Sequence, residues 1–348
     1  MAEPTRPLEW VLCVRLTQPP RVKFALRFPA VLALTVPLLA GSVDGPALEG
    51  DFARLSGGFP GRVGVCATDG LKQACVNPNQ HFALQSVMKL LVAMAVLDAV
   101  DTRGWRLNAD VILHKNDLSL YVQPLANIVN RQGSFRTTIG DVVRRAVVDS
   151  DSAAADFLVR RLGGAEAVQS FLDRKGIHDV RFDRDERHLQ TEITGIEWRT
   201  EFVDASVLDR AISQVPERVR NAANRRYQTD IRDTATPLGM ARMLYALDSG
   251  KLLSPSSTEF LLDVMRQTIT FPDRLKAGTA AGWTILHKTG TSGTWKGLTV
   301  ATNDVGILKA PDGGSIAIAV FVADSPAPDA DRAALIANMA RRTTARWR

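Results

Sequence analysis

The sequence predicts an α+β fold in which an antiparallel sheet flanked by helices packs beside an all-helical lobe. Strand patterns lie near both ends of the chain, at 62–77 and 284–325, and helix patterns fill the region between them. Strands from both ends can pair in one sheet, which leaves the middle of the chain as a second lobe. We expect an α/β lobe at 46–83 and 234–348, a helical lobe at 84–233, and a ligand site in the cleft between them.

The first 42 residues have the pattern of a secretory signal peptide. Basic residues precede an apolar run at 28–40, and the small residues Gly41 and Ser42 follow that run. The run is shorter than the roughly 20 apolar residues that a membrane-spanning helix needs. We expect export to the periplasm or the medium, with no membrane contact once residues 1–42 are removed. An uncleaved anchor or a buried helix fits the same residues.

Composition is that of an ordinary globular protein and does not favour nucleic-acid binding. The chain has 348 residues, enough to bury a sizeable core, and a formal net charge of +6. Residues 1–42 hold five basic and two acidic side chains, so the charge of the remainder falls to +3. The five histidines show no H-x-H or H-E-x-x-H spacing, and G-x-S-x-G, Walker and dinucleotide-binding loops are absent from the sequence. We expect no metal, no cofactor, no nucleic-acid partner and a monomer.

Residues 62–77 predict a β-hairpin that brings two cysteines together. Two apolar runs flank a turn at Asp69-Gly70. A four-residue loop at 69–72 would place Cys66 opposite Cys75, where a cross-strand disulfide can form in an oxidising compartment. Two free, half-buried thiols fit the same residues, and the sequence leaves both possibilities open.

Helix signals fill most of the middle of the chain. Residues 86–100 carry apolar side chains on nearly every face, which predicts a helix buried on all sides. Residues 105–135 are expected to be loops because Asn, Gln, Gly and Pro recur there, and residues 197–230 show patches of helix periodicity with many charges and few apolar anchors. Further helices are expected at 141–148, 150–164, 165–176, 237–252, 256–267 and 327–348, and strands at 284–290, 299–310 and 315–325, the last two joined by a turn at 311–314.

Three short polar motifs occur in a fixed order. They are S-x-x-K at Ser86–Lys89, S-D-S at Ser150–Ser152 and K-T-G at Lys288–Gly290. The i, i+3 spacing puts Lys89 on the same helical face as Ser86, within a helix too apolar for the surface. A buried amine there can accept the hydroxyl proton, and the helix N-terminus favours the developing anion. Each motif alone is compatible with a helix cap or a strand-edge charge, but the ordered set predicts a functional site.

These motifs and the segments around them resemble the class A serine β-lactamases. The likeness runs from about residue 48 to the end of the chain. Residues 182–190 (FDRDERHLQ) resemble the acidic Ω-loop motif of that family, with Glu186 at the position of its general base. Arg184 and Asp233 match the pair that closes this loop by a salt bridge. The resemblance implies the β-lactamase/transpeptidase-like fold and a β-lactam substrate.

The resemblance also implies a role for each motif residue. Ser86 would attack the lactam carbonyl, and its proton would pass to Lys89 or, through a water, to Glu186. The backbone N–H groups of Ser86 and Thr291 would form the oxyanion hole, and Ser150 would relay a proton to the leaving nitrogen. Glu186 would then activate the water that hydrolyses the acyl-enzyme. The substrate carboxylate would be held by Lys288 with the hydroxyls of Thr289, Thr291 and Ser292, next to Gly290, and Tyr121 would stand at the cleft rim.

Three features depart from the family pattern. Ser152 stands where Asn is usual, which shortens or removes an amide contact to the acylamide group of the substrate. Gln190 stands where an Asn usually helps to hold the deacylating water. Glu186 and Asp233 are 47 positions apart, several tens more than usual, so residues 191–230 are interpreted as an insertion into the Ω-loop. The insertion could cap the cleft, change substrate choice or slow deacylation, or be a solvated excursion with no catalytic effect.

The sequence thus predicts a β-lactamase that acts through an acyl-enzyme on Ser86. Two alternatives share this nucleophile. One is a penicillin-interactive D,D-peptidase or esterase, which does not need a water bound by Glu186. The other is a non-catalytic sensor that keeps the β-lactam covalently attached. Gln190 and the long insertion keep the D,D-peptidase or esterase alternative open.

Overall fold

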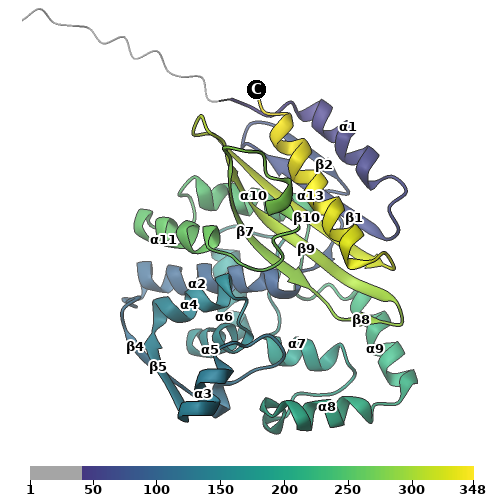
Figure 1. Cartoon of the computed structure of the whole chain (residues 1–348). Coiled ribbons are helices and arrows are strands. Elements are labelled where there is room, and N and C mark those ends of the chain that lie inside the picture. The colour runs from purple at the N-terminus through teal and green to yellow at the C-terminus, as the bar shows by residue number, and fades with distance from the viewer. Residues whose placement is uncertain (1–40) are drawn as a thin grey trace, which may run out of the picture. The chain divides into compact units, whose positions relative to one another are not determined.

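The computed structural model describes residues 41–348 (Figure 1). The predicted signal peptide at 1–42 lies outside these residues, except for Gly41 and Ser42. Within the described range, no helix combines the length and the apolar character needed to cross a membrane.

One antiparallel sheet joins strands from the two ends of the described chain (Figure 1). Its order is β2–β1–β10–β9–β7, with β8 paired to β9. The strands are β1 (Arg62–Thr68), β2 (Gln73–Val76), β7 (Thr284–Thr291), β8 (Thr294–Trp295), β9 (Leu298–Lys309) and β10 (Ser315–Ser325). Two short pairs lie apart from this sheet: β3 (Phe82–Ala83) with β6 (Thr234–Ala235), and β4 (Asp110–His114) with β5 (Ser134–Thr138). The α+β fold class is confirmed.

Both faces of the sheet are covered, and β10 shows how. Ile316 and Ile318 point into a core shared with α1 (Gly45–Ser56) and α13 (Asp329–Ala345), which lie together on one face (Figure 1). The intervening Ala317 and Ala319 join the larger core on the other face. Because side chains of a strand alternate between faces, a strand covered on both sides is apolar throughout.

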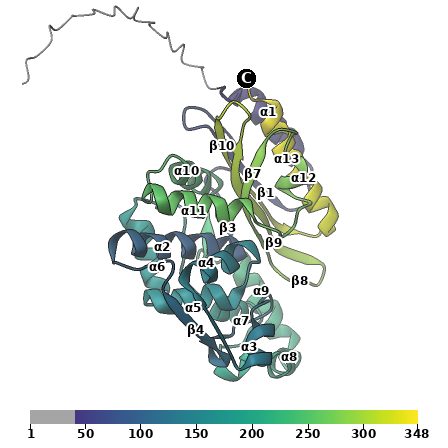
Figure 2. The same cartoon turned by 60° about the vertical axis from the view of Figure 1, so that its left-hand side comes forward.

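The larger core is built around a single helix, α2 (Met88–Thr102). Every residue from Met88 to Ala99 is buried, which confirms the prediction of a helix enclosed on all sides. Figure 2 shows α2 among the helices around it. Other helices that contribute to this core are α3 (Ala126–Gln132), α4 (Ile139–Val148), α5 (Ser152–Leu162), α6 (Ala165–Arg174), α10 (Pro237–Asp248) and α11 (Pro255–Arg266). The one-turn helices η1 (Gln85–Val87) and η2 (Lys115–Asp117) lie nearby in the chain, whereas α12 (Leu275–Gly278) joins the core of α1 and α13. The residue bounds of the two predicted lobes stay a prediction.

The structure decides two predictions, the pairing of the two cysteines and the loops expected at 105–135. The β1–β2 loop spans residues 69–72, and Cys66 pairs with Cys75 both in register and through an S–S bond. The expectation of loops throughout 105–135 is wrong, because β4, α3 and the start of β5 lie there. In β4 the buried Val111 and Leu113 alternate with exposed residues, a strand signal too short to stand out among the polar residues around it.

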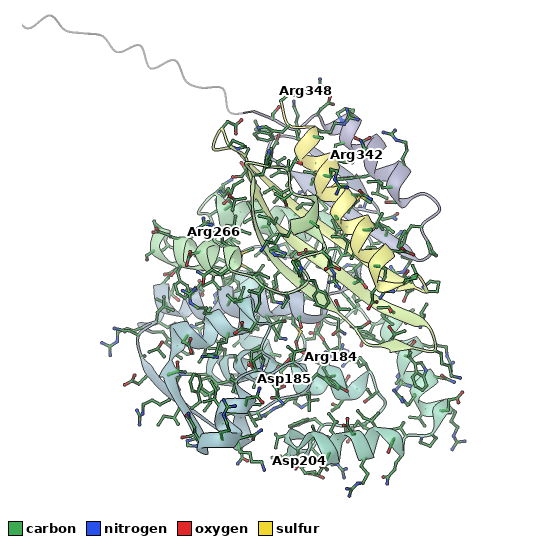
Figure 3. The ribbon with its side chains drawn as sticks, in the orientation of Figure 1. Arg184, Asp185, Asp204, Arg266, Arg342 and Arg348 are labelled. Atoms are coloured by element: carbon green, nitrogen blue, oxygen red, sulfur yellow. A yellow bond between two sulfur atoms is a disulfide. The ribbon has the colours of Figure 1, made fainter. Side chains whose placement is uncertain are left out.

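The predicted insertion is helical. It contains η3 (Thr200–Val203), α8 (Ala205–Ser213) and α9 (Glu217–Thr229), and it follows α7 (Glu186–Glu192). Its small core unites Phe202 and Leu208 with Leu120, which comes from outside the insertion. Figure 3 marks Asp204 at the start of α8, where its carboxylate accepts a hydrogen bond from the Ser206 N–H. The insertion is therefore a folded part of the protein rather than a bare loop.

Candidate active site

Ser86 lies in η1, directly before α2, on a turn that the rest of the fold holds in place. The preceding Gln85 has φ +49°, a strained value for a residue with a side chain. The Asn303 amide donates hydrogen bonds to the carbonyls of Ala83 (2.8 Å) and Leu84 (3.0 Å). The Leu84 N–H in turn donates to the Asp233 carbonyl (2.9 Å). These contacts tie the turn to β9 and to the segment that follows the insertion, and so fix the position of Ser86.

The Lys89 ammonium contacts the nucleophile Ser86, the Ser-Asp-Ser motif and the acidic loop that contains Glu186. It is wholly buried and donates hydrogen bonds to Ser86 Oγ (2.9 Å) and to the Ser150 carbonyl (2.7 Å). It also donates to Ser152 Oγ (3.1 Å) and lies 3.0 Å from Glu186 Oε1. A buried charge needs such partners, because isolated burial of an ion is costly. The structure thus brings the Ser-x-x-Lys, Ser-Asp-Ser and acidic-loop residues to one point.

Ser150 bridges two lysines. Its Oγ accepts a hydrogen bond from Lys288 Nζ at 2.9 Å and lies 3.4 Å from Lys89 Nζ. Burial, and then the nearby Lys89 charge, lower the pKa of Lys288 well below its ordinary value. Asp151 has a structural part, since it accepts hydrogen bonds from the N–H groups of Ala154 (2.9 Å) and Leu125 (2.8 Å). The Ser150 hydroxyl is therefore placed to pass protons between amines.

Gly290 is required by the close approach of β7 to the nucleophile. A Cβ at this position would lie 2.4 Å from the Leu84 carbonyl oxygen, 3.0 Å from the Val87 nitrogen and 3.2 Å from the Ser86 nitrogen. The first distance is impossible for a real side chain, so the glycine of the Lys-Thr-Gly motif lets backbone meet backbone.

Glu186 begins α7, and its carboxylate is oriented by an amide one turn later. Gln190 Nε2 donates to Glu186 Oε2 (3.1 Å) and to Gln85 Oε1 (2.9 Å). Gln85 in turn donates to the Tyr227 hydroxyl on α9. The extra methylene of Gln190, compared with the usual Asn, is thus accommodated by a partner that lies next to the nucleophile.

Asp156, which the sequence analysis did not identify, holds the backbone of Glu186 in place. This buried carboxyl accepts hydrogen bonds from the Glu186 N–H (2.8 Å) and from the Ser119 hydroxyl (2.5 Å). Burial, reinforced by the Asp185 and Glu186 carboxylates, raises the pKa of Asp156 to about 7. It lies within a helix pattern and 30 positions from Glu186, so spacing gave no signal.

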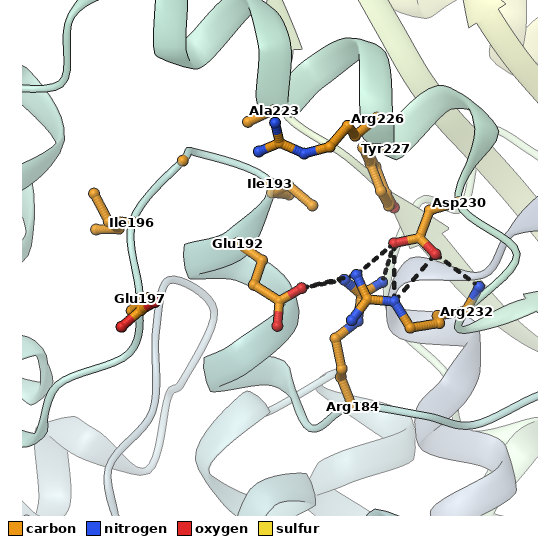
Figure 4. A pocket seen from close by; sticks show the side chains of 11 residues that line it. Arg184, Glu192, Ile193, Ile196, Glu197, Ala223, Arg226, Tyr227, Asp230 and Arg232 are labelled. Carbon is orange, nitrogen blue, oxygen red and sulfur yellow. Dashed lines mark hydrogen bonds and ion pairs between the residues drawn. The ribbon is translucent and has the colours of Figure 1, made fainter.

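The predicted pair of Arg184 and Asp233 is present. It is part of a larger ion cluster, and Figure 4 shows Arg184 in that cluster with Glu192, Asp230 and Arg232. Arg184 Nε lies 2.7 Å from Asp233 Oδ2, and Arg184 Nη1 lies 2.7 Å from Glu192. Arg232 contacts Glu192 (3.0 Å) and Asp230 (2.8 Å). Residues that precede and follow the insertion are therefore held together at its base.

A cavity of about 440 Å³ opens over these groups. Ser86 and Glu186 line it, and Tyr121, with φ +56° and about half its surface exposed, lines its rim. Among the predicted site residues, Ser152, Gln190, Thr291 and Ser292 also line the cavity, whereas Lys89, Ser150, Lys288, Thr289 and Gly290 are buried around it. This arrangement suits covalent catalysis on a small molecule.

Comparisons with known proteins agree with this geometry. A model of the β-lactamase enzyme family matches residues 47–347. The chain belongs to the β-lactamase enzyme family. The extended-spectrum β-lactamase PER-1 of Pseudomonas aeruginosa is 27% identical over 92% of this chain and 94% of its own.

Solved β-lactamase structures are similar in fold to this β-lactamase. A β-lactamase from Chitinophaga pinensis has a TM-score of 0.70 and 28% identity, over 85% of this chain and 97% of its own. A representative class A β-lactamase from Bacteroides cellulosilyticus has a TM-score of 0.69 and 26% identity, over 86% of this chain and 96% of its own. The resemblance to class A enzymes is thereby confirmed.

The end of the cavity lined by Thr291 and Ser292, where the substrate carboxylate is predicted to bind, has contacts that the sequence did not reveal. The Ser292 hydroxyl accepts hydrogen bonds from the N–H groups of Val300 and Ala301 (3.1 Å each) and so is engaged with β9 instead of pointing freely into the cavity. Arg274, which sequence reasoning missed, donates to Thr291 Oγ1 at 2.7 Å. Burial lowers the pKa of Arg274 to about 10, so its guanidinium stays charged at neutral pH. Thr289 Oγ1 pairs with Thr270 Oγ1 at 2.6 Å.

Proposed function

We propose that this β-lactamase hydrolyses the amide of a β-lactam through an acyl-enzyme on Ser86, with Glu186 assisting deacylation. The observation that carries the proposal is the position of Lys89 Nζ. It lies 2.9 Å from Ser86 Oγ and 3.0 Å from Glu186 Oε1, next to a cavity that Ser86 and Glu186 both line.

In acylation, Ser86 Oγ bonds to the lactam carbonyl carbon, and the lactam C–N bond then breaks. The hydroxyl proton passes to Lys89 after that amine has given a proton to Glu186, or to Glu186 through a water. The N–H groups of Ser86 and Thr291 stabilise the oxyanion. The Ser150 hydroxyl, which contacts both lysines, passes a proton from Lys89 to the leaving nitrogen. Lys89 then takes a proton back from Glu186, which is again a carboxylate before deacylation.

In deacylation, Glu186 removes a proton from a water that attacks the acyl carbon, and the Ser86 oxygen leaves with a proton. The Gln190 amide fixes Glu186 Oε2 for this step. The substrate carboxylate is held by Thr291 and by Arg274, whose positive charge suits an anion, at the end of the cavity next to Lys288. Neither the D,D-peptidase nor the sensor alternative is favoured by an observation of its own.

We further propose that the protein is exported and acts in the periplasm or the medium. The disulfide between Cys66 and Cys75 supports this, because such bonds persist in oxidising compartments. The signal-like pattern at 1–42 agrees. N-terminal sequencing of the protein recovered from an extracytoplasmic fraction tests it, and recovery of full-length protein in the cytoplasm alone would reject it.

Turnover of nitrocefin and benzylpenicillin by the purified protein tests the enzymatic proposal. Wild-type protein is expected to hydrolyse both, and Ser86→Ala to hydrolyse neither while it melts at a similar temperature. Absence of wild-type hydrolysis would reject the proposal. Release of D-Ala from a peptidoglycan-like peptide, with only slow lactam deacylation, would instead indicate the D,D-peptidase alternative.

A further inference from the structure

Helix α9 of the insertion is anchored on two sides of the catalytic cavity. On one side the Tyr227 hydroxyl accepts a hydrogen bond from Gln85, the neighbour of Ser86. On the other side the Trp295 indole donates to Asn221 Oδ1 at 2.8 Å, and Lys296 pairs with Glu217. The insertion therefore forms a fixed wall between the nucleophile and the β8 hairpin.

This wall presents one guanidinium to the cavity, that of Arg220. Arg220 lines the same cavity as Ser86 and Glu186, as well as a smaller one of about 90 Å³ between α9 and β8. Its guanidinium carbon lies 3.8 Å from the centre of the Trp295 ring, a stacked arrangement that holds the side chain in place. Burial and the Asp209 carboxylate raise the pKa of Tyr121 at the rim, whereas the Arg220 charge lowers it. The stacked Arg220 side chain therefore holds its guanidinium at the edge of the cavity that Ser86 and Glu186 line.

Within residues 41–348, Arg220 has neither a carboxylate at ion-pair distance nor a side-chain hydrogen bond. Its neighbours differ, since Arg184, Arg232 and Lys296 are each paired with acidic side chains. A half-buried guanidinium has lost part of its hydration, and stacking leaves its N–H edges free to donate. It therefore offers a preformed contact for an anionic group that enters the cavity.

The orientation of the substrate decides which anionic group that is. Arg274 lies 3.8 Å from the centre of the Phe271 ring and contacts Thr291, so the ring carboxylate belongs at that end of the cavity. In the proposed acylation step the lactam carbonyl lies between Ser86 and β7. The acyl side chain of the β-lactam then extends toward the end lined by Ile193, Thr194 and Arg220.

We propose that Arg220 is a specificity-determining residue that recognises a carboxylate on the acyl side chain of the β-lactam. The proposal rests on the proposed function, because it assumes that orientation of the substrate. The carboxylate forms a charge-assisted hydrogen bond to a guanidinium that is already stacked and partly desolvated, so little reorganisation opposes binding.

Carbenicillin and benzylpenicillin form a matched pair, because they differ by one carboxylate on the acyl side chain. Arg220→Gln is expected to lower kcat/KM for carbenicillin about tenfold, mainly through KM, and to change benzylpenicillin by less than about twofold. Arg220→Lys keeps the charge and should restore much of the preference, whereas Arg220→Glu should reduce it further. The effect should shrink as salt concentration rises, because the cavity is open to solvent.

Arg218→Gln is the control, because Arg218 is an exposed residue of the same helix that lines neither cavity. It should leave both penicillins unchanged. Equal losses for the two penicillins in Arg220→Gln, or no loss for either, would overturn the inference. Calorimetric binding to Ser86→Ala, with and without Arg220→Gln, separates this outcome from failure of the proposed function. In this experiment Ser86→Ala should bind carbenicillin more tightly than the double variant does, even if the wild-type protein hydrolyses neither penicillin. A carbenicillin affinity that does not depend on Arg220 would refute the inference.

Discussion

Replacing Gly290 by Ala tests how closely β7 must approach the nucleophile. The new Cβ would lie 2.4 Å from the Leu84 carbonyl oxygen, and real Cβ atoms essentially never come closer than 3.0 Å to a heavy atom. The contacted atoms belong to the backbone of the Ser86 turn, so no flexible side chain can give way. Either β7 or the turn must therefore move by more than half an ångström, since the gap must widen from 2.4 to at least 3.0 Å.

Two effects of different size follow from that movement. Overpacking a close contact costs about 1–3 kcal/mol of unfolding free energy. A protein of this size loses about 2–4 °C of melting temperature for each kcal/mol. The displacement also shifts the Thr291 N–H and Lys288 relative to Ser86, and a misplacement of about 1 Å costs about a hundredfold in rate. Loss of turnover should thus be much larger than loss of stability.

Nitrocefin kinetics and thermal melting of Gly290→Ala measure both effects. Gly50→Ala in α1 is the matched control, because its Cβ meets only the Arg54 side chain at 3.5 Å, an ordinary contact. Alanine is also favoured over glycine inside a helix by about 0.5–1 kcal/mol. The control should keep full activity and melt at the same or a higher temperature. Wild-type turnover by Gly290→Ala would refute the reasoning.

Three further outcomes are expected. Because burial raises the pKa of Asp156 to about 7, the folded protein keeps a proton there that the unfolded chain releases near pH 4. The contribution of this group to the free energy of unfolding therefore falls as pH rises from about 4 to 7, by at most about 1.4 kcal/mol per pH unit. In Asp156→Asn, the free energy of unfolding measured in urea should depend less on pH over that range. An unchanged pH dependence would contradict this. Arg274→Gln should raise KM for benzylpenicillin about tenfold with a smaller change in kcat, and an effect confined to kcat would argue against its contact with the substrate. Cys75→Ser should lower the unfolding free energy by up to about 3 kcal/mol, as should reduction of the wild type, with turnover kept; identical melting with and without reductant would count against the disulfide.

Hydrophobic patterning predicted most of the fold, because a strand or helix that is buried on all sides has a run of apolar residues that can be recognised from its own sequence. The apolar run at 90–97 in α2 and the apolar β10 are of this kind. The β4–α3 region and the insertion were harder. Polar residues interrupt the apolar ones in both regions, and the small core of the insertion depends on Leu120, which lies more than 80 positions before Phe202. Contacts over such distances leave no local pattern.

The motifs likewise located the catalytic groups but not their supports. Residues one helical turn apart, such as Ser86 and Lys89, can be placed by spacing alone. Asp156 and Arg274 act through contacts made across 30 and 17 positions, and neither belongs to a motif. The direction of the Ser292 hydroxyl depends on how β7 ends against β9, which is a property of the folded strands.

Covalent trapping of benzylpenicillin tests the central claim most directly. Glu186→Gln keeps the shape of the side chain but cannot act as a base for deacylation, so the acyl-enzyme should accumulate. Intact-mass measurement should show protein heavier by one benzylpenicillin, with the added mass on the peptide that contains Ser86. Wild-type protein should return to its original mass while hydrolysed product forms, and Ser86→Ala should remain unlabelled. An unlabelled Glu186→Gln variant that is still folded, or a label on another residue, would contradict the account.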